Sequence, residues 1–286
     1  MKSATVQNFD LSSTLESGQI FRYIRLPDGY LIHQRDRIFR VCQRGNTLCF
    51  AGAEKRFISH YFRLDEDNGK IIKTLTKDRE VRRAVELYRG LRILRQDPWE
   101  CLVSFLCSST KSIAHIRVIV ERLCRVFGEP VSISDYQGYA FPREGTINSP
   151  EKLKAIGLGF RARYVYEVNH IVQQGYLDDI VGKPYTEARA LFMQLPGVGE
   201  KIADCVLLFS LGFLEAFPTD TWIKRGMEKT YFQGQRIPSK GIGEYARKRF
   251  GPYAGYAQQY LYHYWRERGR QSLRVDAKSR SRIQKI

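Results

Sequence analysis

Apolar and polar residues alternate in short segments over about the first 65 residues of the chain. The alternation is clearest at residues 30–33, 38–42 and 48–50, and the turn sequences PDG (27–29) and RGN (44–46) lie beside these segments. A period of two residues is typical of a strand, and Gly-containing turns join such strands into antiparallel hairpins. The first part of the chain is therefore predicted to be β-rich.

From about residue 68 the apolar residues follow the three-to-four-residue spacing of helices, and this pattern continues to the end. Asp78 begins a charged amphipathic helix that ends at Gly90, and Asp97 followed by Pro98 begins a helix that is apolar nearly all round. These are ordinary start signals, because Asp caps a free N–H and Pro fits the first turn. Further helices are predicted over residues 112–127, 150–157, 186–195 (capped by Thr186), 200–212, 219–232, 239–250 and 255–268.

The change of period predicts an α+β fold in which a small antiparallel β domain packs on a mainly α-helical domain. We place the β-rich domain at residues 1–84 and the helical domain at residues 85–286, the latter with a basic C-terminal tail. The sequence contains no internal repeat and no low-complexity linker, so the boundary is a change of period and not a spacer.

The net charge adds the strongest global signal. The 286 residues carry a formal net charge of +17, and the isoelectric point is near 9.7. Exposed Lys and Arg release counterions when they meet phosphates, so a polyanionic partner is expected, nucleic acid before membrane. A basic protein without such a partner is the alternative.

Composition also excludes several classes of protein. No run of about 18 apolar residues suggests a membrane span, and the N-terminus has no apolar signal core. We therefore expect an intracellular protein, in the cytoplasm or nucleoid of a prokaryote or in the nucleus of a eukaryote. The six cysteines show no CxxC pair and no Cys/His ligand spacing, which argues against zinc or a cysteine-ligated cluster.

The segment LPGVG (195–199) places two glycines in a tight turn directly before an apolar helix. Such a turn exposes backbone N–H groups with no side chains in the way, and the helix dipole adds its positive end. Phosphate is the anion that this site would bind, so Gly197, Val198 and Gly199 are candidate DNA-binding residues. A plain turn between two helices is the alternative, since a lone Gly-x-Gly is a weak motif.

Lys201 and Asp220 are the candidates for covalent chemistry. Lys201 lies in the first turn of the apolar helix, where the dipole disfavours a cation and partial desolvation favours a neutral, nucleophilic amine. Cys205 follows four residues later on the same helical face. Asp220 stands at the predicted start of the next helix and could face a cationic transition state. A solvated lysine and an ordinary capping aspartate are the alternatives.

Residues 159–163 (GFRAR) place an aromatic ring beside two arginines where a loop enters a helix. In a DNA-binding protein, an exposed Phe160 can enter a base stack while Arg161 and Arg163 reach phosphates or an unpaired base. Core packing with a solvated rim is the alternative. The aromatic residues over 253–265 are core positions by default, although one or two of the rings could stack on a base.

Six segments together resemble the helix-hairpin-helix DNA glycosylases, and more closely the 8-oxoguanine DNA glycosylases of the eukaryotic type, which carry an N-terminal β domain. In the order of that family they are SGQIFR (17–22), QDPWECLVSFLCSS (96–109), GLGFRARY (157–164), LPGVGEKIADC (195–205), PTD (218–220) and GPYAGYAQ (251–258). Six segments in order are far more specific than the hairpin alone, and they span most of the chain.

The resemblance implies a mechanism. Lys201 would attack C1′ of the damaged nucleoside and release the base, and the resulting Schiff base would allow β-elimination of the strand. Asp220 would stabilise the oxocarbenium-like charge and help orient or deprotonate the amine. A base inside the duplex cannot be attacked at C1′, so base flipping is required. Phe160 would then be the wedge, and Arg161 would contact the orphaned opposite base.

The resemblance also implies how the lesion is recognised. 8-Oxoguanine carries a proton on N7 where guanine has a lone pair, so an acceptor at that position discriminates between them. The family uses a glycine carbonyl there, which corresponds to Gly18. Gln258 would bind the Watson–Crick edge of the base, and Cys205 and Tyr262 would lie against its two faces.

Three positions depart from the best-known pattern of the family. Thr110 stands where the family often has an Asn that fills the gap left by the flipped base, His115 replaces an Arg that contacts the opposite cytosine, and Trp222 replaces a His near a backbone phosphate. Because two of three opposite-strand contacts are altered, we predict a weaker preference for cytosine opposite the lesion, measurable on duplexes that differ only in that base.

The sequence therefore predicts a bifunctional 8-oxoguanine DNA glycosylase and AP lyase that acts on double-stranded DNA as a monomer. No cofactor and no metal site is expected, although the hairpin carbonyls could converge on a monovalent cation. Two alternatives stay open: a glycosylase of the same fold for another damaged base, and a non-catalytic DNA-binding module. Gly18 and Gln258 argue against the first, and the pair Lys201 and Asp220 argues against the second.

Overall fold

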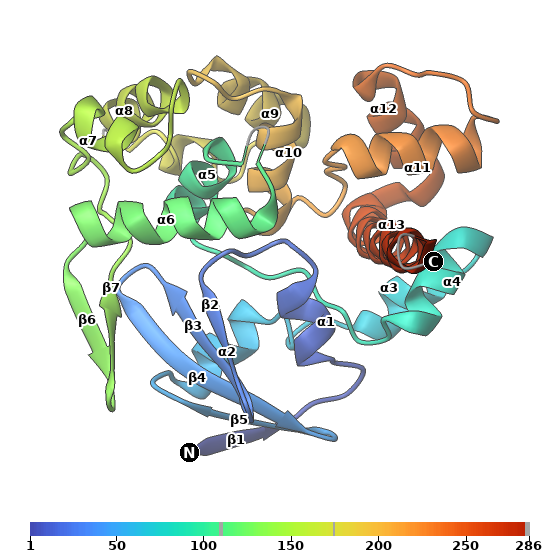
Figure 1. Cartoon of the computed structure of the whole chain (residues 1–286), viewed down its shortest axis with the longest axis horizontal. Coiled ribbons are helices and arrows are strands. Elements are labelled where there is room, and N and C mark those ends of the chain that lie inside the picture. Colours follow the sequence, from blue (N-terminus) through green and yellow to red (C-terminus); the bar gives the residue numbers. More distant parts are fainter. Residues whose placement is uncertain (109–110, 174, 284–286) are drawn as a thin grey trace.

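The structure, a computed structural model, describes residues 1–108, 111–173 and 175–283, with side chains described as far as residue 269. An antiparallel sheet, a group of helices next to it and a second group of helices beside both make up the chain (Figure 1). The predicted combination of an N-terminal antiparallel β part with a mainly helical remainder is confirmed.

Within the described residues the N-terminal sheet has five strands in the order β1-β5-β4-β3-β2, all antiparallel. They are β1 (Lys2–Thr5), β2 (Tyr23–Leu26), β3 (Gly29–Gln34), β4 (Arg37–Arg44) and β5 (Thr47–Ala51). The alternation places Phe39 and Val41 of β4 with Leu48 and Phe50 of β5 in one buried cluster, which α2 (Lys55–Tyr61) covers. The three strands predicted from alternation are confirmed.

Two short helices lie in the part of the chain that was predicted to be strand-like, α1 (Leu11–Glu16) and α2. Asp10 caps α1 by accepting the N–H of Ser13 at 2.6 Å, and Leu11 and Leu15, four residues apart, are buried on one face. A capped helix of 6 residues is too short for its periodicity to stand out in the sequence.

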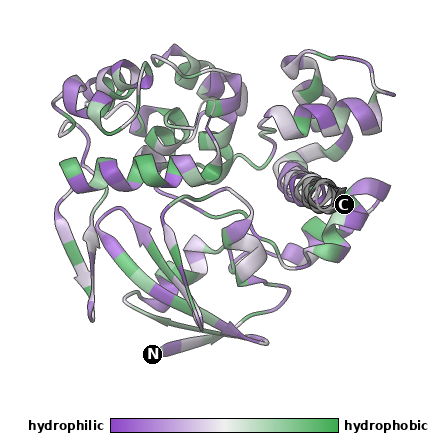
Figure 2. Ribbon diagram, viewed as in Figure 1, coloured by the Kyte–Doolittle hydropathy of each residue, from purple (hydrophilic) through white to green (hydrophobic). Residues whose placement is uncertain are grey.

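The helical group that continues from the sheet includes α5 (Pro98–Leu106), which is buried on nearly all sides as predicted. Its cap is also confirmed, because Asp97 accepts the N–H of Glu100 at 2.8 Å. The remaining helices of this group are α6 (Ile113–Phe127), α7 (Pro150–Ala155), α8 (Arg161–Val172), α9 (Tyr185–Gln194) and α10 (Glu200–Phe209). In Figure 2 the apolar residues concentrate on α5, α6 and α10, around which the helical core is built.

The second helical group packs around the C-terminal helix and consists of α3 (Asn68–Leu75), α4 (Arg79–Leu87), α11 (Thr221–Tyr231), α12 (Ser239–Phe250) and α13 (Ala254–Ile283). The segment between α10 and α11 links the two groups. The predicted boundary between residues 84 and 85 falls inside α4, and α4 packs on α13 of the second helical group. The division into residues 1–84 and 85–286 stays a prediction.

Several predicted helix bounds are wrong. Thr186 does not cap α9, which begins at Tyr185 after Pro184 and has no side-chain cap. Helix α10 ends at Phe209, three residues before Gly212. Helix α13 continues to Ile283, so the basic end of the chain is helical over most of its length. Helix ends depend on tertiary packing as well as on local signals, so they are the least predictable part of a helix.

The prediction that the chain stays helical after residue 68 is also wrong, because β6 (Pro130–Ile133) and β7 (Tyr136–Tyr139) form a hairpin. An isolated hairpin is only marginally stable in water, and this one packs against β4. Gly138 permits the close approach, since a Cβ there would lie 2.7 Å from the ring of His33. Tertiary contact therefore decides this element.

No helix among the described residues is long and apolar enough to cross a membrane.

Candidate active site

A pocket of about 1060 Å³ opens where α10, the start of α11 and α13 meet the segment around residue 18. Seven of the residues singled out in the sequence line it: Gly18, Lys201, Cys205, Asp220, Trp222, Gln258 and Tyr262. They come from four separate segments, and the fold brings all of them to one cavity.

The hairpin between α9 and α10 has the geometry expected of a phosphate site. Gly197 has φ +76°, and a Cβ there would lie 2.5 Å from the ring of Tyr164, so only glycine fits. A Cβ on Gly199 would meet nothing within 4 Å, and no side chain caps α10. Val198 is buried and its N–H is donated to the carbonyl of Leu195 at 3.1 Å. The free N–H groups of the first turn of α10 therefore face an open approach.

Lys201 is half-buried in the first turn of α10 and points toward the end of α5. Its Nζ donates to Oγ of Ser108 at 3.1 Å and lies 4.8 Å from the ring centroid of Phe105. The hydrogen bond to Ser108 and the aromatic face of Phe105 hold the amine inside the pocket, and no ion pair within 4.0 Å joins Lys201 to an acid among the described residues. An amine held in this way is a candidate nucleophile.

Asp220 caps α11, as predicted, because its Oδ1 accepts the N–H of Ile223 at 2.8 Å. Removal from water raises the pKa of the Asp220 carboxyl, while the N–H of Ile223 and the positive charge of Lys201 oppose the increase. The cap fixes the carboxylate at the edge of the pocket, where it can stabilise positive charge on a bound sugar.

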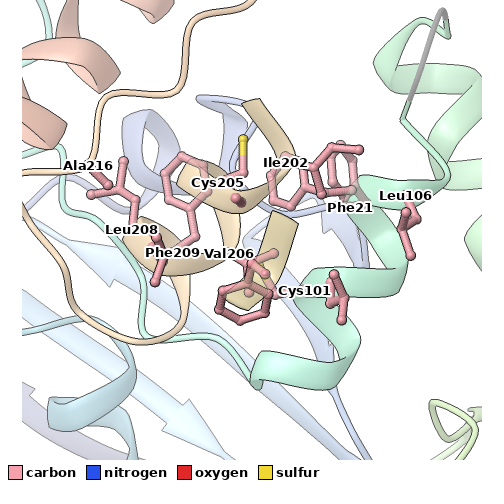
Figure 3. Packing of buried hydrophobic residues seen from close by; sticks show 14 of the residues in the cluster. Phe21, Cys101, Leu106, Ile202, Cys205, Val206, Leu208, Phe209 and Ala216 are labelled. Carbon is pink, nitrogen blue, oxygen red and sulfur yellow. The ribbon is translucent and has the colours of Figure 1, made fainter. Parts of the chain in front are cut away.

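Cys205 is 2% exposed and lies in the large hydrophobic cluster (Figure 3). Burial raises the pKa of its thiol to about 12, although Lys201 nearby opposes the increase. The side chain is therefore a neutral, polarizable wall of the pocket and not a nucleophile.

Gly18 and the first turns of α13 form the opposite wall. Gly18 has φ +87°, and a Cβ there would lie 3.1 Å from Cε1 of Tyr262. Gln258 is 4% exposed, and its Oε1 has no hydrogen-bond partner among the described residues. Next to it, Gln259 donates from Nε2 to the carbonyl of Ser17 at 3.1 Å, which ties α13 to the Gly18 segment. This wall therefore offers polar groups on a fixed backbone.

Sequence reasoning missed several residues of the pocket. Besides Ser108 and Arg266, the lining includes the cations Lys111, Lys224, Arg225 and Arg236. The lining has six cations, counted with Lys201 and Arg266, and two carboxylates, Asp220 and Glu228. The net charge of the chain predicted a basic surface. No local sequence pattern, however, distinguished these residues among the 47 Lys and Arg.

The predicted wedge lies outside the pocket lining. Phe160 is 63% exposed at the start of α8, as a wedge requires. Arg161 is 3% exposed, its guanidinium lies 4.8 Å from the Phe160 ring centroid, and its Nη1 donates to the carbonyl of Leu158 at 2.7 Å. The structure therefore places Arg161 inward, where it supports the wedge, and its contact with an orphaned base stays a prediction.

The three departures from the family pattern lie in different surroundings. His115 is exposed in the first turn of α6, and its Nδ1 lies 3.1 Å from Oγ of Ser112. Trp222 lies at the pocket and its ring packs close to Gly269, where a Cβ would come within 2.5 Å. Thr110 lies outside the described residues.

Comparison with known proteins agrees with this geometry. Residues 3–102 match the N-terminal domain of 8-oxoguanine DNA glycosylases. A probable N-glycosylase/DNA lyase of Methanothermobacter thermautotrophicus is 30% identical over 219 residues, which are 68% of this chain and 70% of that protein.

Two solved structures are similar over nearly the whole chain. MBOgg1 in complex with a low affinity DNA ligand is 35% identical with a TM-score of 0.89, covering 94% of this chain and 100% of that one. The 8-oxoguanine glycosylase/lyase of Clostridium acetobutylicum, in complex with double-stranded DNA containing cytosine opposite 8-oxoG, is 31% identical with a TM-score of 0.88, covering 92% and 94%.

Proposed function

Since the chain belongs to the family of 8-oxoguanine DNA glycosylases that are also DNA lyases, we propose that it is a bifunctional enzyme of base excision repair. It removes 8-oxoguanine from duplex DNA and then cleaves the strand at the abasic site. The observation that carries this function is the convergence of Lys201 and Asp220 with Gly18, Cys205 and Gln258 on one pocket.

Binding of the duplex begins with the phosphate backbone. The N–H groups of the first turn of α10, beside Gly199, bind one phosphate, and Lys224, Arg225 and Arg236 surround the pocket with positive charge. These contacts are independent of base sequence, which suits an enzyme that must search all DNA. Phe160 fills the stack as the damaged nucleotide turns out of the duplex.

The flipped base enters between Cys205 and Tyr262. The neutral thiol and the aromatic ring contact its two faces, and Gln258 offers its amide to the Watson–Crick edge. The carbonyl of Gly18 accepts the N7–H of 8-oxoguanine. Guanine would place the lone pair of its N7 against that carbonyl. Two buried acceptors would then face each other without a donor between them, which disfavours binding.

Base release and strand cleavage both proceed through Lys201. Its neutral amine forms a bond to C1′ as the C1′–N9 bond breaks, and the base departs with the bonding electrons and takes up a proton. Asp220 stabilises the positive charge that develops on the sugar, and Ser108 orients the amine. The ring-opened Schiff base then loses a C2′ proton, and the C3′–O bond breaks with the phosphate as leaving group.

Borohydride trapping on a duplex containing 8-oxoguanine tests this function. We expect the wild-type chain to become covalently attached to the strand, because borohydride reduces a Schiff base to a stable amine. Lys201→Gln is expected to abolish trapping and to reduce base release by more than about 10³-fold. Lys224→Gln, which removes another lysine of the same pocket, is the matched control and should still trap.

The same experiment separates the alternatives. A wild-type chain that binds the duplex but never traps would be a DNA-binding module. Trapping on a duplex with an alkylated purine or an oxidised pyrimidine, and not with 8-oxoguanine, would indicate another lesion.

A further inference from the structure

We propose that Arg266 is a specificity-determining residue of this pocket, which holds the Gly18 segment in place and donates an N–H to a carbonyl oxygen beside N7 of the damaged base. This inference rests on the proposed excision of 8-oxoguanine. No motif in the sequence marked this residue, because in the sequence it is one arginine of a basic C-terminal stretch.

Arg266 lies on α13 one turn after Tyr262, lines the same pocket and is only 4% exposed. Burying a guanidinium removes it from water, and this is tolerated only where hydrogen bonds and charges compensate. The contacts of this side chain therefore indicate its role.

Part of the guanidinium holds the wall that carries Gly18. Nη2 donates to the carbonyl of Glu16, two residues before Gly18, at 2.7 Å. The same nitrogen lies 3.2 Å from Nδ1 of His263, and Nε donates to Oε1 of Glu267 at 3.2 Å. These contacts fix the side chain on α13 and connect it to the N-terminal segment.

The third nitrogen, Nη1, is buried and has no hydrogen-bond partner among the described residues. It lies 2.5 Å from the position that a Cβ on Gly18 would occupy, so it stands directly beside that residue. A charged N–H left without an acceptor in a buried site is unfavourable. Gln258 lines the same pocket, and its Oε1 is an acceptor that likewise has no partner within the described part of the chain. The pocket thus holds an unmatched donor and an unmatched acceptor.

The edge of 8-oxoguanine that faces Gly18 has a matching pattern. N7–H is a donor, and the carbonyl oxygens O6 and O8 on either side of it are acceptors. An acceptor at Gly18 with a donor next to it from Arg266 therefore complements this edge. The Arg266 donor alone would also suit N7 of guanine, but the Gly18 carbonyl repels that lone pair.

Tyr262 controls access to this donor. The Cζ atom of Arg266 lies 5.1 Å from the Tyr262 ring centroid, and Cε1 of Tyr262 is 3.1 Å from the same Cβ position of Gly18. The ring therefore covers Nη1, and a shift of the ring as it stacks on the base exposes the donor to the base edge.

The test compares base release with strand cleavage at a preformed abasic site, which has no base to contact. For Arg266→Met we expect single-turnover release of 8-oxoguanine to fall by about 10- to 100-fold, while cleavage of the abasic duplex stays within about 3-fold of wild type. Arg266→Lys keeps the charge but not the forked donor, so we expect a smaller loss of base release.

Arg92→Met is the matched control. Arg92 is 3% exposed and donates to the backbone carbonyls of Gln7, Arg63 and Glu66, but it does not line the pocket. This variant shows how the loss of a buried arginine that binds backbone carbonyls affects the fold. The rates of base release and of abasic-site cleavage should therefore change together in it.

The inference is overturned if Arg266→Met lowers both rates equally, or if base release is unchanged. If Arg266→Met does not fold, the Arg266→Lys variant provides the test. Base release at the wild-type rate in Arg266→Lys would also overturn the inference. A wild-type enzyme that never releases 8-oxoguanine contradicts the proposed function itself, whatever Arg266 does.

Discussion

The two walls of the pocket are built in different ways. The wall that holds the proposed catalytic residues is local: Lys201 and Asp220 are 19 residues apart (220 − 201), at the starts of α10 and α11. The wall that is proposed to bind the edge of the base is assembled from opposite ends of the chain, since Gly18 and Tyr262 are 244 residues apart (262 − 18). In the proposed mechanism, covalent chemistry thus depends on two helix starts, whereas lesion recognition depends on long-range contacts.

This difference predicts that base release and strand cleavage can be separated by mutation. The base-binding wall is held by contacts such as Gln259 to Ser17 and Arg266 to Glu16, none of which touches Lys201. Changes there should affect base release more than strand cleavage. Changes to the chemical wall should affect both, because in the proposed mechanism both steps use the Lys201 amine.

Asp220→Asn probes the chemical wall and has the largest expected effect among the following changes. We expect base release to fall by about 10²- to 10³-fold, because the amide keeps the N-cap but no longer stabilises positive charge. Single-turnover assays on 8-oxoguanine and abasic duplexes measure this, and thermal unfolding should change little. Asp67→Asn, at the N-cap of α3, is the control. Unchanged base release in Asp220→Asn would contradict the assigned role.

Gly18→Ala probes the base-binding wall. A Cβ at φ +87° is strained and would lie 2.5 Å from Nη1 of Arg266, so the carbonyl must move. We expect base release to fall by about 10- to 100-fold while abasic cleavage is nearly retained. Gly45→Ala, at φ +55° with nothing within 4 Å, introduces similar strain without contact. Equal losses of both activities in Gly18→Ala would show that the walls are coupled.

The pH dependence of base release is expected to show the smallest effect of the three. It measures how the charge of Arg266, in the base-binding wall, influences Asp220 in the chemical wall. Burial raises the pKa of Asp220, so its carboxylate is present above that raised pKa, and activity is lost as the pH falls through it. The positive charge of Arg266 is one of the influences that hold this pKa down. In Arg266→Met the acid limb of the base-release profile should therefore move to higher pH, measured between about pH 4 and pH 8. An acid limb that moves to lower pH would contradict this sign.

Sequence reasoning succeeded where the signal was local. The caps at Asp97 and Asp220, the hydrophobic α5 and the glycines of the α9–α10 hairpin were all predicted from a few neighbouring residues. Six segments in family order then indicated the family, and the candidate residues Gly18, Gln258 and Tyr262 that they contain or adjoin do line the pocket. It failed at the β6–β7 hairpin, which is stabilised by packing against β4.

The structure corrected the surroundings of individual residues more than their identity. Arg161 is buried under Phe160 and donates to a backbone carbonyl, although its neighbours in sequence suggested an outward arginine. Ser108 was not singled out, because a serine after an apolar helix has no distinctive pattern. Its contact with Lys201 spans 93 residues of sequence.

By itself, the sequence determined the class of fold, the basic character of the protein and the capped starts of α5 and α11, because each depends on residue type and short-range spacing. Only the tertiary structure decided that Gly18, Gln258 and Arg266 share one pocket, and that one nitrogen of a buried arginine beside Gly18 has no partner in the part of the chain that the structure describes. The reason is physical: burial and hydrogen-bond satisfaction depend on what packs around a side chain, and in this wall the packing partners lie more than two hundred residues apart.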